Sequence, residues 1–203
     1  MDHNPQGRSL GARRALTLAL FTALAVPARS AVLDELREFF TGKIEAISTT
    51  ARSGDWDAYA TGFAWHVPWA YDNATRSRLN ERAWGGGFGR STTDGDGDRH
   101  SVFLMGFSDS HRAPQFVAGY AWHRYWKPAG DWHAGFGYMA FLTSREDVAH
   151  RWPIAAVLPC LSIRRGRCEI IGLFVPRVSK NIKGDVFFVF SRFALGAERK
   201  PAR

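Results

Sequence analysis

Residues 115–126 read QFVAGYAWHRYW, residues 127–131 read KPAGD, and residues 132–143 read WHAGFGYMAFLT. The two outer stretches, Gln115–Trp126 and Trp132–Thr143, are rich in aromatic and β-branched residues, which favour strands. The proline and glycine between them favour a turn. We therefore predict two strands joined by a short turn in this part of the chain.

Six further stretches share this composition, and turn residues separate several of them, as in DGDGD at 94–98 and KNIKG at 180–184. An even number of strands is expected for a bacterial barrel made from one chain. Residues 62–193 are thus predicted to form an all-β fold, an eight-stranded antiparallel β-barrel. The six further stretches are Gly62–Tyr71, Arg78–Ser91, Asp98–Phe107, Trp152–Ile163, Arg167–Pro176 and Asp185–Phe193.

The composition indicates that this barrel crosses a membrane. No stretch after residue 30 contains the roughly 18 consecutive apolar residues of a transmembrane helix, and a closed barrel is the other structure that can cross a bilayer. The 203 residues are 14% aromatic, with 8 Trp and 15 Phe, and such side chains favour membrane–water boundaries. The net charge of +8 suits nucleic acid, an anionic membrane or a phosphorylated glycolipid as partners.

The first thirty residues have the pattern of a secretory signal peptide. Three arginines precede the apolar run Ala15–Val26, and the small residues Ala28 and Ser30 follow it. A buried N-terminal helix is the alternative reading. We predict that residues 1–30 are a signal peptide and that the exported protein comprises residues 31–203, which leaves no role in nucleic-acid binding.

Residues 31–50 have the pattern of an amphipathic helix, because apolar residues recur at spacings of three and four with charged residues between them. Such a helix could lie on a membrane surface, cap one end of the barrel, or belong to an ordinary soluble core. The apolar positions are Leu33, Leu36, Phe39, Phe40, Ile44 and Ile47.

The interior of the predicted barrel is expected to be apolar. In the stretch DVFFVF at 185–190 both faces of the strand carry apolar side chains, whereas a water-filled pore requires a polar inner face. An eight-stranded barrel has room for side chains or one small ligand. The pattern therefore favours a lumen that holds a hydrocarbon chain.

Three motifs make the sequence specific: WHVPWAYD at 65–72, NERAWGGGFG at 80–89 and FSDS at 107–110. They resemble the lipid A palmitoyltransferases, the PagP family, and the resemblance extends from about Phe63 to Phe193. It implies a monomeric enzyme, without a cofactor or metal, in the outer membrane of a Gram-negative bacterium. The implied reaction moves a fatty acyl chain, palmitate or a somewhat shorter one, from a phospholipid to lipid A.

The resemblance also implies roles for individual residues. His66, Asp109 and Ser110 match the family's essential residues, and Pro159 and Pro176 match prolines beside a lateral opening through which lipid substrates pass. If odd-numbered strands run outward, His66 and Asp109–Ser110 fall at the same, extracellular end of the barrel. That end faces the leaflet that contains lipid A.

Acyl transfer needs a nucleophile, a group that moves protons and donors for the developing oxyanion. We expect His66 to act as general base, for the lipid A hydroxyl or for Ser110, and Asp109 to orient or charge the imidazole. Ser110 either attacks the ester or donates a hydrogen bond to the oxyanion. A covalent acyl-enzyme and direct transfer both remain open.

The chain departs from the family pattern at several positions. Thr61 and Ala83 stand where the family often has prolines beside a second lateral opening, and Ser179 replaces a tyrosine. Ala121 stands where the family commonly has a glycine at the floor of the acyl pocket. Because packed interiors respond to a single methylene, Ala121 is expected to shorten the preferred acyl chain.

Other patterns have simpler readings. The glycines of GGGFG at 85–89 are expected to allow close packing rather than to bind phosphate, and the acidic turn 94–98 lacks the remaining ligands of a calcium loop. Cys160 and Cys168 flank a turn, so that they form either a disulfide or two free thiols. Arg76, Arg78 and Arg82 either pair with lipid A phosphates or belong to a solvated loop. Residues 196–203 form a tail beyond the last strand.

Two other classes of protein compete with the acyltransferase. A non-enzymatic outer-membrane barrel for adhesion or scaffolding would share the fold, but it would have no use for His66 and Asp109–Ser110 at one end. A soluble periplasmic lipid-binding barrel would expose polar rather than aromatic side chains on its outer wall.

Overall fold

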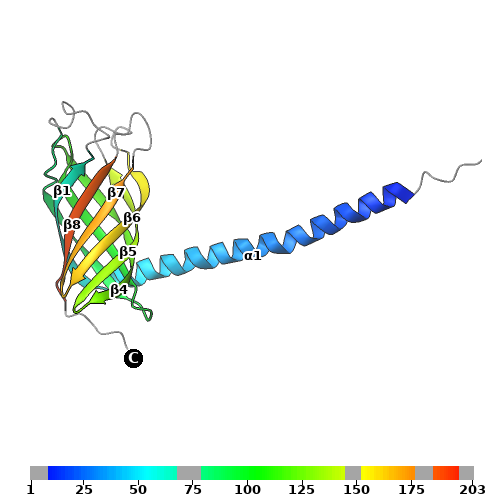
Figure 1. The fold of residues 1–203 in the computed structure, drawn as a ribbon, viewed down its shortest axis with the longest axis horizontal. Helices are drawn as coiled ribbons and strands as arrows, with labels where there is room; N and C mark the ends of the chain where they lie inside the picture. Colours follow the sequence, from blue (N-terminus) through cyan, green and yellow to red (C-terminus); the bar gives the residue numbers. More distant parts are fainter. Residues whose placement is uncertain (1–8, 68–78, 145–151, 177–184, 197–203) are drawn as a thin grey trace, which may run out of the picture. The chain divides into compact units, whose positions relative to one another are not determined.

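The computed structural model describes residues 9–67, 79–144, 152–176 and 185–196, with side chains from residue 31 onward. It contains one helix, α1 (Ser9–Ser53), followed by strands (Figure 1). Among the described residues, no helix has both the length and the apolar character needed to span a membrane. By contacts the chain divides into two units, residues 1–45 and residues 46–203.

The strands close into one antiparallel barrel in sequence order, because β1 pairs with β8 as well as with β2. The predicted eight-stranded antiparallel barrel with an N-terminal helix is confirmed. The strands are β1 (Asp55–His66), β2 (Gly85–Thr93), β3 (Arg99–Ser108), β4 (Pro114–Ala129), β5 (Trp132–Ser144), β6 (Ile154–Arg165), β7 (Cys168–Val175) and β8 (Val186–Ala194).

The first two strands differ from the predicted stretches. β1 begins at Asp55 rather than Gly62, so that the barrel spans 55–194 instead of 62–193. The sequence did not predict the start of this strand, because one of its inward positions is the charged residue Asp57, which is fully buried. β2 begins at Gly85 rather than Arg78, because residues 79–84 belong to no strand.

The last turn of α1 belongs to the barrel unit. Arg90 of β2 donates hydrogen bonds to the carbonyl oxygens of Ala51 (2.8 Å) and Arg52 (2.7 Å), which would otherwise lack helical partners. The hydroxyl groups of Thr50 and Thr92 form a hydrogen bond, with their oxygen atoms 2.7 Å apart. The predicted amphipathic helix 31–50 lies within α1. The cleavage of residues 1–30 stays a prediction.

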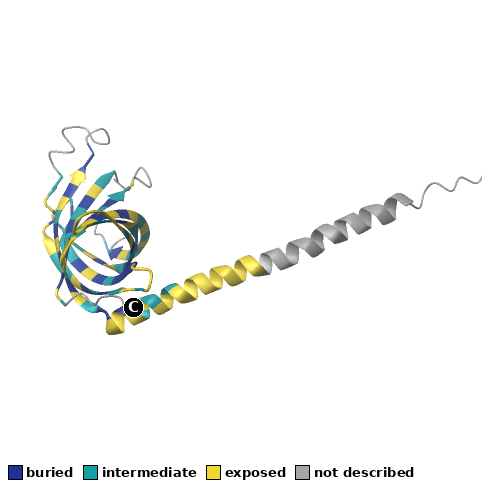
Figure 2. Cartoon of the chain, turned by 60° about the horizontal axis from the view of Figure 1, so that its bottom comes forward, coloured by how far each residue is buried: buried dark blue, intermediate teal, exposed yellow. Residues whose placement is uncertain are grey.

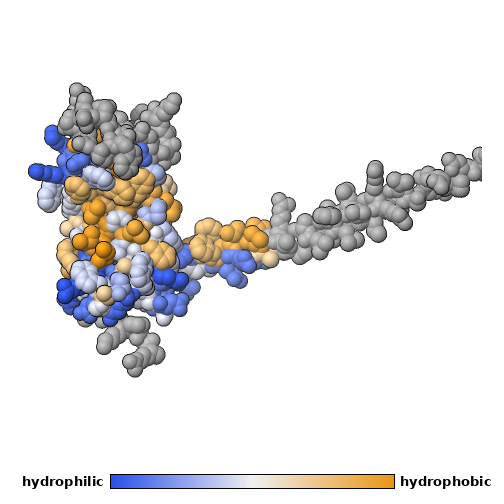
Figure 3. All heavy atoms as spheres, in the orientation of Figure 1, coloured by the Kyte–Doolittle hydropathy of each residue, from blue (hydrophilic) through white to orange (hydrophobic). Residues whose placement is uncertain are grey.

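The outer wall of the barrel is apolar. Buried and exposed residues alternate along the strands (Figure 2). On the face of the barrel shown in Figure 3, apolar side chains form a band with hydrophilic residues below it. Exposed tryptophans lie at strand ends on both sides of this band, as expected at two membrane interfaces. The soluble lipid-binding barrel is therefore disfavoured. These tryptophans are Trp56, Trp126 and Trp132 at one end and Trp65, Trp84 and Trp152 at the other.

The two ends of the barrel differ in their connections. The turn end carries the β2–β3, β4–β5 and β6–β7 turns, and the loop end is the opposite one, where β1, β3, β5 and β7 finish. Between the ends lies a buried apolar layer, defined by Tyr59, Phe103, Ile171 and Phe190. The rings of Phe103 and Phe190 lie 6.1 and 6.2 Å from that of Tyr59.

The glycines of β2 make this layer possible. A Cβ at Gly87 would lie 2.7 Å from the side chain of Met105, and one at Gly89 would lie 3.0 Å from the ring of Tyr59. Both Cβ positions would also lie closer than 2.5 Å to backbone oxygens of β3. The prediction that the GGGFG glycines allow close packing is confirmed.

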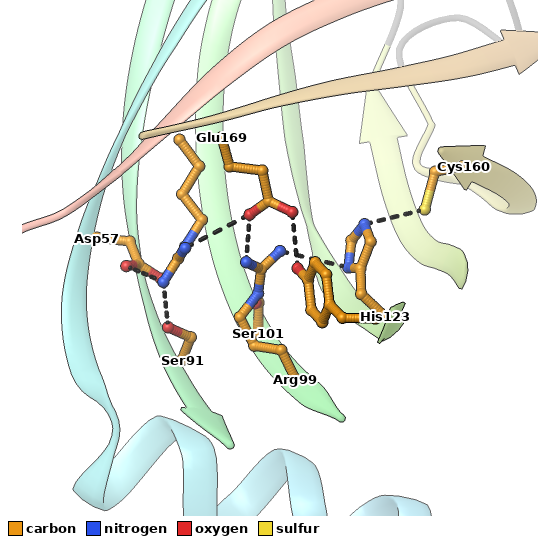
Figure 4. Close-up of polar contacts among 9 residues, drawn as sticks. Asp57, Ser91, Arg99, Ser101, His123, Cys160 and Glu169 are labelled. Carbon is orange, nitrogen blue, oxygen red and sulfur yellow. Dashed lines mark hydrogen bonds and ion pairs between the residues drawn. The ribbon is translucent and has the colours of Figure 1, made fainter. Parts of the chain in front are cut away.

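A polar layer fills the barrel between the apolar layer and the turn end (Figure 4). Its centre is Glu169, which accepts hydrogen bonds from Arg99 and from the Tyr125 hydroxyl (2.6 Å) and pairs with Arg192 at 3.4 Å. Arg192 also pairs with Asp57 at 2.8 Å. The layer comprises Asp57, Ser91, Arg99, Ser101, His123, Tyr125, Cys160, Glu169 and Arg192.

The two cysteines do not face each other. Cys160 pairs in register with Leu173 of β7, whereas Cys168 pairs with Arg165 of β6, and both thiols are free. Cys160 is buried with its sulfur 3.3 Å from Nε2 of His123. Of the two alternatives, the structure contains free thiols, because the register keeps the two positions apart.

The acidic β2–β3 turn is held by its own hydrogen bonds. Asp94 accepts backbone N–H groups from Asp96 and Asp98 and lies 3.0 Å from Nε2 of His100. Burial raises the pKa of Asp94, but the hydrogen bonds from His100 and from Asp98 and Asp96 outweigh it and hold the pKa below its usual value. Among the described residues, no cluster of His, Cys, Asp and Glu is suited to a metal ion.

We predict that Glu169→Gln strongly destabilises the barrel. The change removes the carboxylate that pairs with Arg99 and leaves Arg192 with Asp57 as its remaining carboxylate partner. Removing one partner of a buried pair costs about 3–5 kcal/mol. The free energy of unfolding, measured by urea titration of the barrel in lipid vesicles, should fall by that amount. Arg124→Gln, which breaks the more exposed Arg124–Asp98 pair (2.8 Å), is the control and should change little. Equal effects of the two variants would contradict the prediction.

Candidate active site

Two of the predicted catalytic residues are in contact at the loop end. His66 is the last residue of β1, and Ser110 lies in the loop that follows β3. Nε2 of His66 and Oγ of Ser110 are 3.1 Å apart, although 44 positions separate them in the sequence. The imidazole is 1% exposed. A histidine at this distance can take a proton from the hydroxyl group.

The loop after β3 is a tight turn closed by Asp109. One carboxylate oxygen of Asp109 accepts the N–H groups of His111 and Ala113, each at 2.8 Å, and the Asp109 N–H donates to the carbonyl of Ala113 at 2.8 Å. Arg112 has a φ of 65°, a conformation that non-glycine residues seldom adopt and that is enriched at functional sites. These contacts of Asp109 hold the shape of the loop that presents Ser110.

A cavity of about 320 Å³ begins at this pair and extends into the barrel. Near the loop end its wall includes His66, Ser110, Gln115 and Thr143, with Gln115 donating to the Thr143 hydroxyl at 2.8 Å. Deeper in the barrel the lining becomes apolar. The deep lining residues are Met105, Val117, Met139, Leu158, Leu173 and Phe188.

The cavity ends above Ala121. This residue is buried at 3% exposure in the apolar core but is not part of the cavity lining. Its register partner across the β4–β5 ladder is Met139, which is 2% exposed and does line the cavity. Met139 and Met105 thus form the floor in this structure, and the apolar and polar layers lie beneath them.

The β6–β7 seam is open at the level of the cavity. The ladder between these strands runs from Arg165–Cys168 to Cys160–Leu173 and pairs no described residue beyond that point, although β6 continues to Ile154. Pro159 is the first residue past the ladder, and Pro176 directly follows β7 and lines the cavity. A proline has no N–H for a ladder. The two prolines therefore lie where the barrel wall is incomplete.

The β1–β2 seam also lacks a ladder near the loop end, but it is bridged. Pairing stops at Thr61–Gly85. Beyond it, the Thr61 hydroxyl donates to the carbonyl of Ala83 at 2.6 Å and the Ala64 N–H donates to the carbonyl of Glu81 at 2.9 Å. The two positions that lack the family's prolines thus supply a hydrogen bond across the seam.

Comparison with known proteins identifies the family. The model of the antimicrobial peptide resistance and lipid A acylation protein PagP matches residues 46–192. The chain belongs to the PagP family. The lipid A acyltransferase PagP of Bordetella parapertussis is 34% identical over 173 residues, which cover 85% of this chain and 94% of the relative.

Two further relatives cover similar shares of this PagP-family chain. The lipid A acyltransferase PagP of Methylobacillus flagellatus is 36% identical over 86% of this chain and 95% of its own length. The lipid A palmitoyltransferase PagP of Escherichia coli O6:K15:H31 is 35% identical over 77% of this chain and 84% of its own length. The resemblance inferred from the three sequence motifs is confirmed.

Some predicted positions of this PagP-family chain lie outside the described residues: Arg76, Arg78 and Ser179. Arg82 is exposed near the loop end, and its pairing with lipid A phosphates stays a prediction. Sequence reasoning missed Met139, which sits in the well-predicted β5 but has no feature that distinguishes a floor residue from any other inward position. It also missed Asn80, although this residue begins the NERAWGGGFG motif.

We predict that Pro159→Ala slows lipid A acylation in bilayers. The alanine restores an N–H, so that the β6–β7 ladder can extend and narrow the opening. The acylation rate in lipid vesicles should fall several-fold, while the rate in detergent micelles should change less. Pro128→Ala, near the turn end of β4 and away from both the seam and the His66–Ser110 pair, is the control. Equal rates of Pro159→Ala and the unaltered protein in vesicles would contradict a role for this seam.

Proposed function

We propose that this chain is an outer-membrane enzyme that transfers one fatty acyl group from a phospholipid to a hydroxyl group of lipid A. The single observation that carries the proposal is the His66–Ser110 contact at the mouth of an apolar cavity inside the barrel. The apolar cavity can hold the hydrocarbon part of a fatty acyl chain. The His66–Ser110 contact then lies where acyl transfer would take place, at the ester group of that chain. Lipid A acylation is the activity that the family description names.

The reaction requires no cofactor. The acyl carbon forms a bond to the lipid A oxygen and loses its bond to the glycerol oxygen of the donor, which leaves as a lysophospholipid. His66 takes the proton of the attacking hydroxyl group and returns one to the departing glycerol oxygen. In one route Ser110 attacks first and forms an acyl-serine; in the other it donates a hydrogen bond to the oxyanion of direct transfer.

The membrane orientation follows from the substrates. Lipid A occupies the outer leaflet, so the loop end faces outward and the turn end faces the periplasm. The donor enters laterally through the β6–β7 seam, because its acyl chain then passes from the bilayer into the cavity without crossing water. The barrel closes on itself and carries both groups of the His66–Ser110 pair, so that we propose a monomer as the active form.

The transferred chain is palmitate or a somewhat shorter one, and the depth of the cavity favours a short chain. From Thr143 at the polar rim to Met139 at the floor, β5 advances four residues, which is roughly 13 Å along the strand. Because strands of such a barrel are tilted by about 40° from its axis, the depth along the axis is roughly 10 Å. One leaflet of the hydrocarbon core is about 15 Å thick. A chain long enough to fill a leaflet therefore exceeds the depth of this cavity.

We predict that lipid A from cells expressing this chain gains the mass of one fatty acyl group. The gain should disappear in His66→Ala and in Ser110→Ala, because each removes one half of the pair. His133→Ala is the matched control, since this histidine is the second residue of β5, at the turn end, and it should keep the gain. Mass spectrometry of lipid A makes the measurement, and heat-modifiable gel mobility shows that each barrel is folded.

A folded barrel without any mass gain would overturn the proposed function and favour the adhesion or scaffolding barrel. A mass gain that survives in both variants would keep the activity and overturn the site. An acyl adduct on Ser110, trapped in the unaltered protein and seen by intact mass, would select the covalent route.

We predict that Met139→Ala lengthens the transferred acyl chain. The shorter side chain extends the cavity toward Ala121 and the apolar layer, and the mass added to lipid A should rise by one or more two-carbon units. Met139→Leu, a change that conserves volume, is the control. Ala121→Gly should have a smaller effect, because Met139 still covers it. A longer chain with Ala121→Gly and an unchanged one with Met139→Ala would restore Ala121 as the floor, as its position in the sequence suggested.

A further inference from the structure

Residues 79–84 connect the two halves of the active site. They belong to no strand, and they lie between the end of β1 and the loop after β3. On one side the Ala64 N–H donates to the carbonyl of Glu81 at 2.9 Å. On the other side the Ser108 N–H donates to the carbonyl of Trp84 at 2.9 Å, and the Asn80 N–H donates to the carbonyl of Ser110 at 2.9 Å.

Asn80 has the most contacts of this segment. Its side-chain amide donates to the carbonyl of Asp109 at 3.3 Å and to that of Arg82 at 2.8 Å, and its amide oxygen accepts the Arg82 N–H at 3.1 Å. The same amide nitrogen lies 3.5 Å from the Ser108 hydroxyl. The backbone and side chain of one residue thus hold two successive carbonyl groups of the catalytic loop, those of Asp109 and Ser110.

The carboxylate of Asp109 cannot replace this anchor. Its hydrogen bonds to His111 and Ala113 run within the loop, so that they maintain the shape of the loop without fixing its place on the barrel. The β3–β4 ladder holds the two ends of the loop. Asn80 ties its middle to β1, because the Asn80 segment is bonded to Ala64, two residues before His66. A continuous path of bonds therefore runs from the base, through Glu81 and Asn80, to Ser110.

We propose that Asn80 is a positioning residue that keeps Ser110 Oγ within hydrogen-bond reach of His66 Nε2; this rests on the proposed function. Asn80 touches neither substrate nor the reacting atoms, and it acts through Ser110. Reaction rates depend steeply on geometry: a displacement of about 1 Å can cost about 100-fold. Loss of a partly exposed side-chain hydrogen bond costs the fold far less. Removing the side chain should therefore reduce turnover much more than stability.

The experiment compares Asn80→Ala and Asn80→Asp with the unaltered protein, using a phospholipid donor and lipid A in detergent micelles. The alanine removes all side-chain contacts, and the aspartate keeps the acceptor for Arg82 but turns an oxygen toward the Asp109 carbonyl. We expect kcat to fall about 10- to 100-fold in both variants, with KM for the donor and the urea midpoint of the barrel nearly unchanged. Thr61→Val, which removes the seam hydrogen bond to Ala83 from the same segment, is the control and should keep kcat.

A second measurement separates positioning from a general loss of structure. If Asn80 acts through Ser110, adding Asn80→Ala to Ser110→Ala should lower the residual rate by less than 3-fold, because residues that act as a unit are non-additive. A full additional loss in that background, a raised KM with unchanged kcat, or wild-type kcat in both variants would overturn the proposal. If the unaltered protein itself transfers no acyl group, the proposed function fails together with the inference; an active protein with active Asn80 variants overturns the inference alone.

Discussion

The pairing of β1 with β8 is the constraint on which the rest of the structure depends. It joins the first strand of the sheet to the last, so that backbone groups along this junction find partners and the outer wall can carry an apolar band. It also encloses an interior in which charged side chains meet. Asp57 of β1 and Arg192 of β8 form an ion pair between these two neighbouring strands, and Glu169 joins Arg192 to Arg99. Without closure the Asp57–Arg192 pair would be lost, because it joins the first strand to the last.

Neighbouring strands are paired all around the barrel at the turn end, but two pairs of strands lack a ladder near the loop end. The stabilising layers and the candidate active site lie in these different parts of the barrel. The polar and apolar layers fill the complete part. The cavity, the His66–Ser110 pair and both seams occupy the incomplete part. A barrel that takes lipid from the bilayer needs a place where two neighbouring strands are not hydrogen-bonded. Here one seam is left open beside Pro159, and the other is bridged by the hydroxyl of Thr61.

Prediction from the sequence succeeded where alternation and turn residues were strong. The β4–β5 hairpin and the number of strands were predicted because each depends on neighbouring residues. It failed at the start of β1, because an inward Asp57 breaks the expected apolar pattern. It also suggested that Cys160 and Cys168 could face each other, and the observed register prevents this. Register depends on how far one strand slides along another, and a turn sequence constrains it only locally.

The sequence by itself determined the fold class, the membrane setting, the family and the residues of the His66–Ser110 pair, because composition, alternation and motifs are local properties of the chain. Only the tertiary structure decided which inward residues share a level of the barrel. Met139 rather than Ala121 lies at the cavity floor, Glu169 collects two arginines from other strands, and Asn80 reaches the loop of Ser110. Each of these depends on the stagger of strands around a closed barrel, which is set by all eight ladders together.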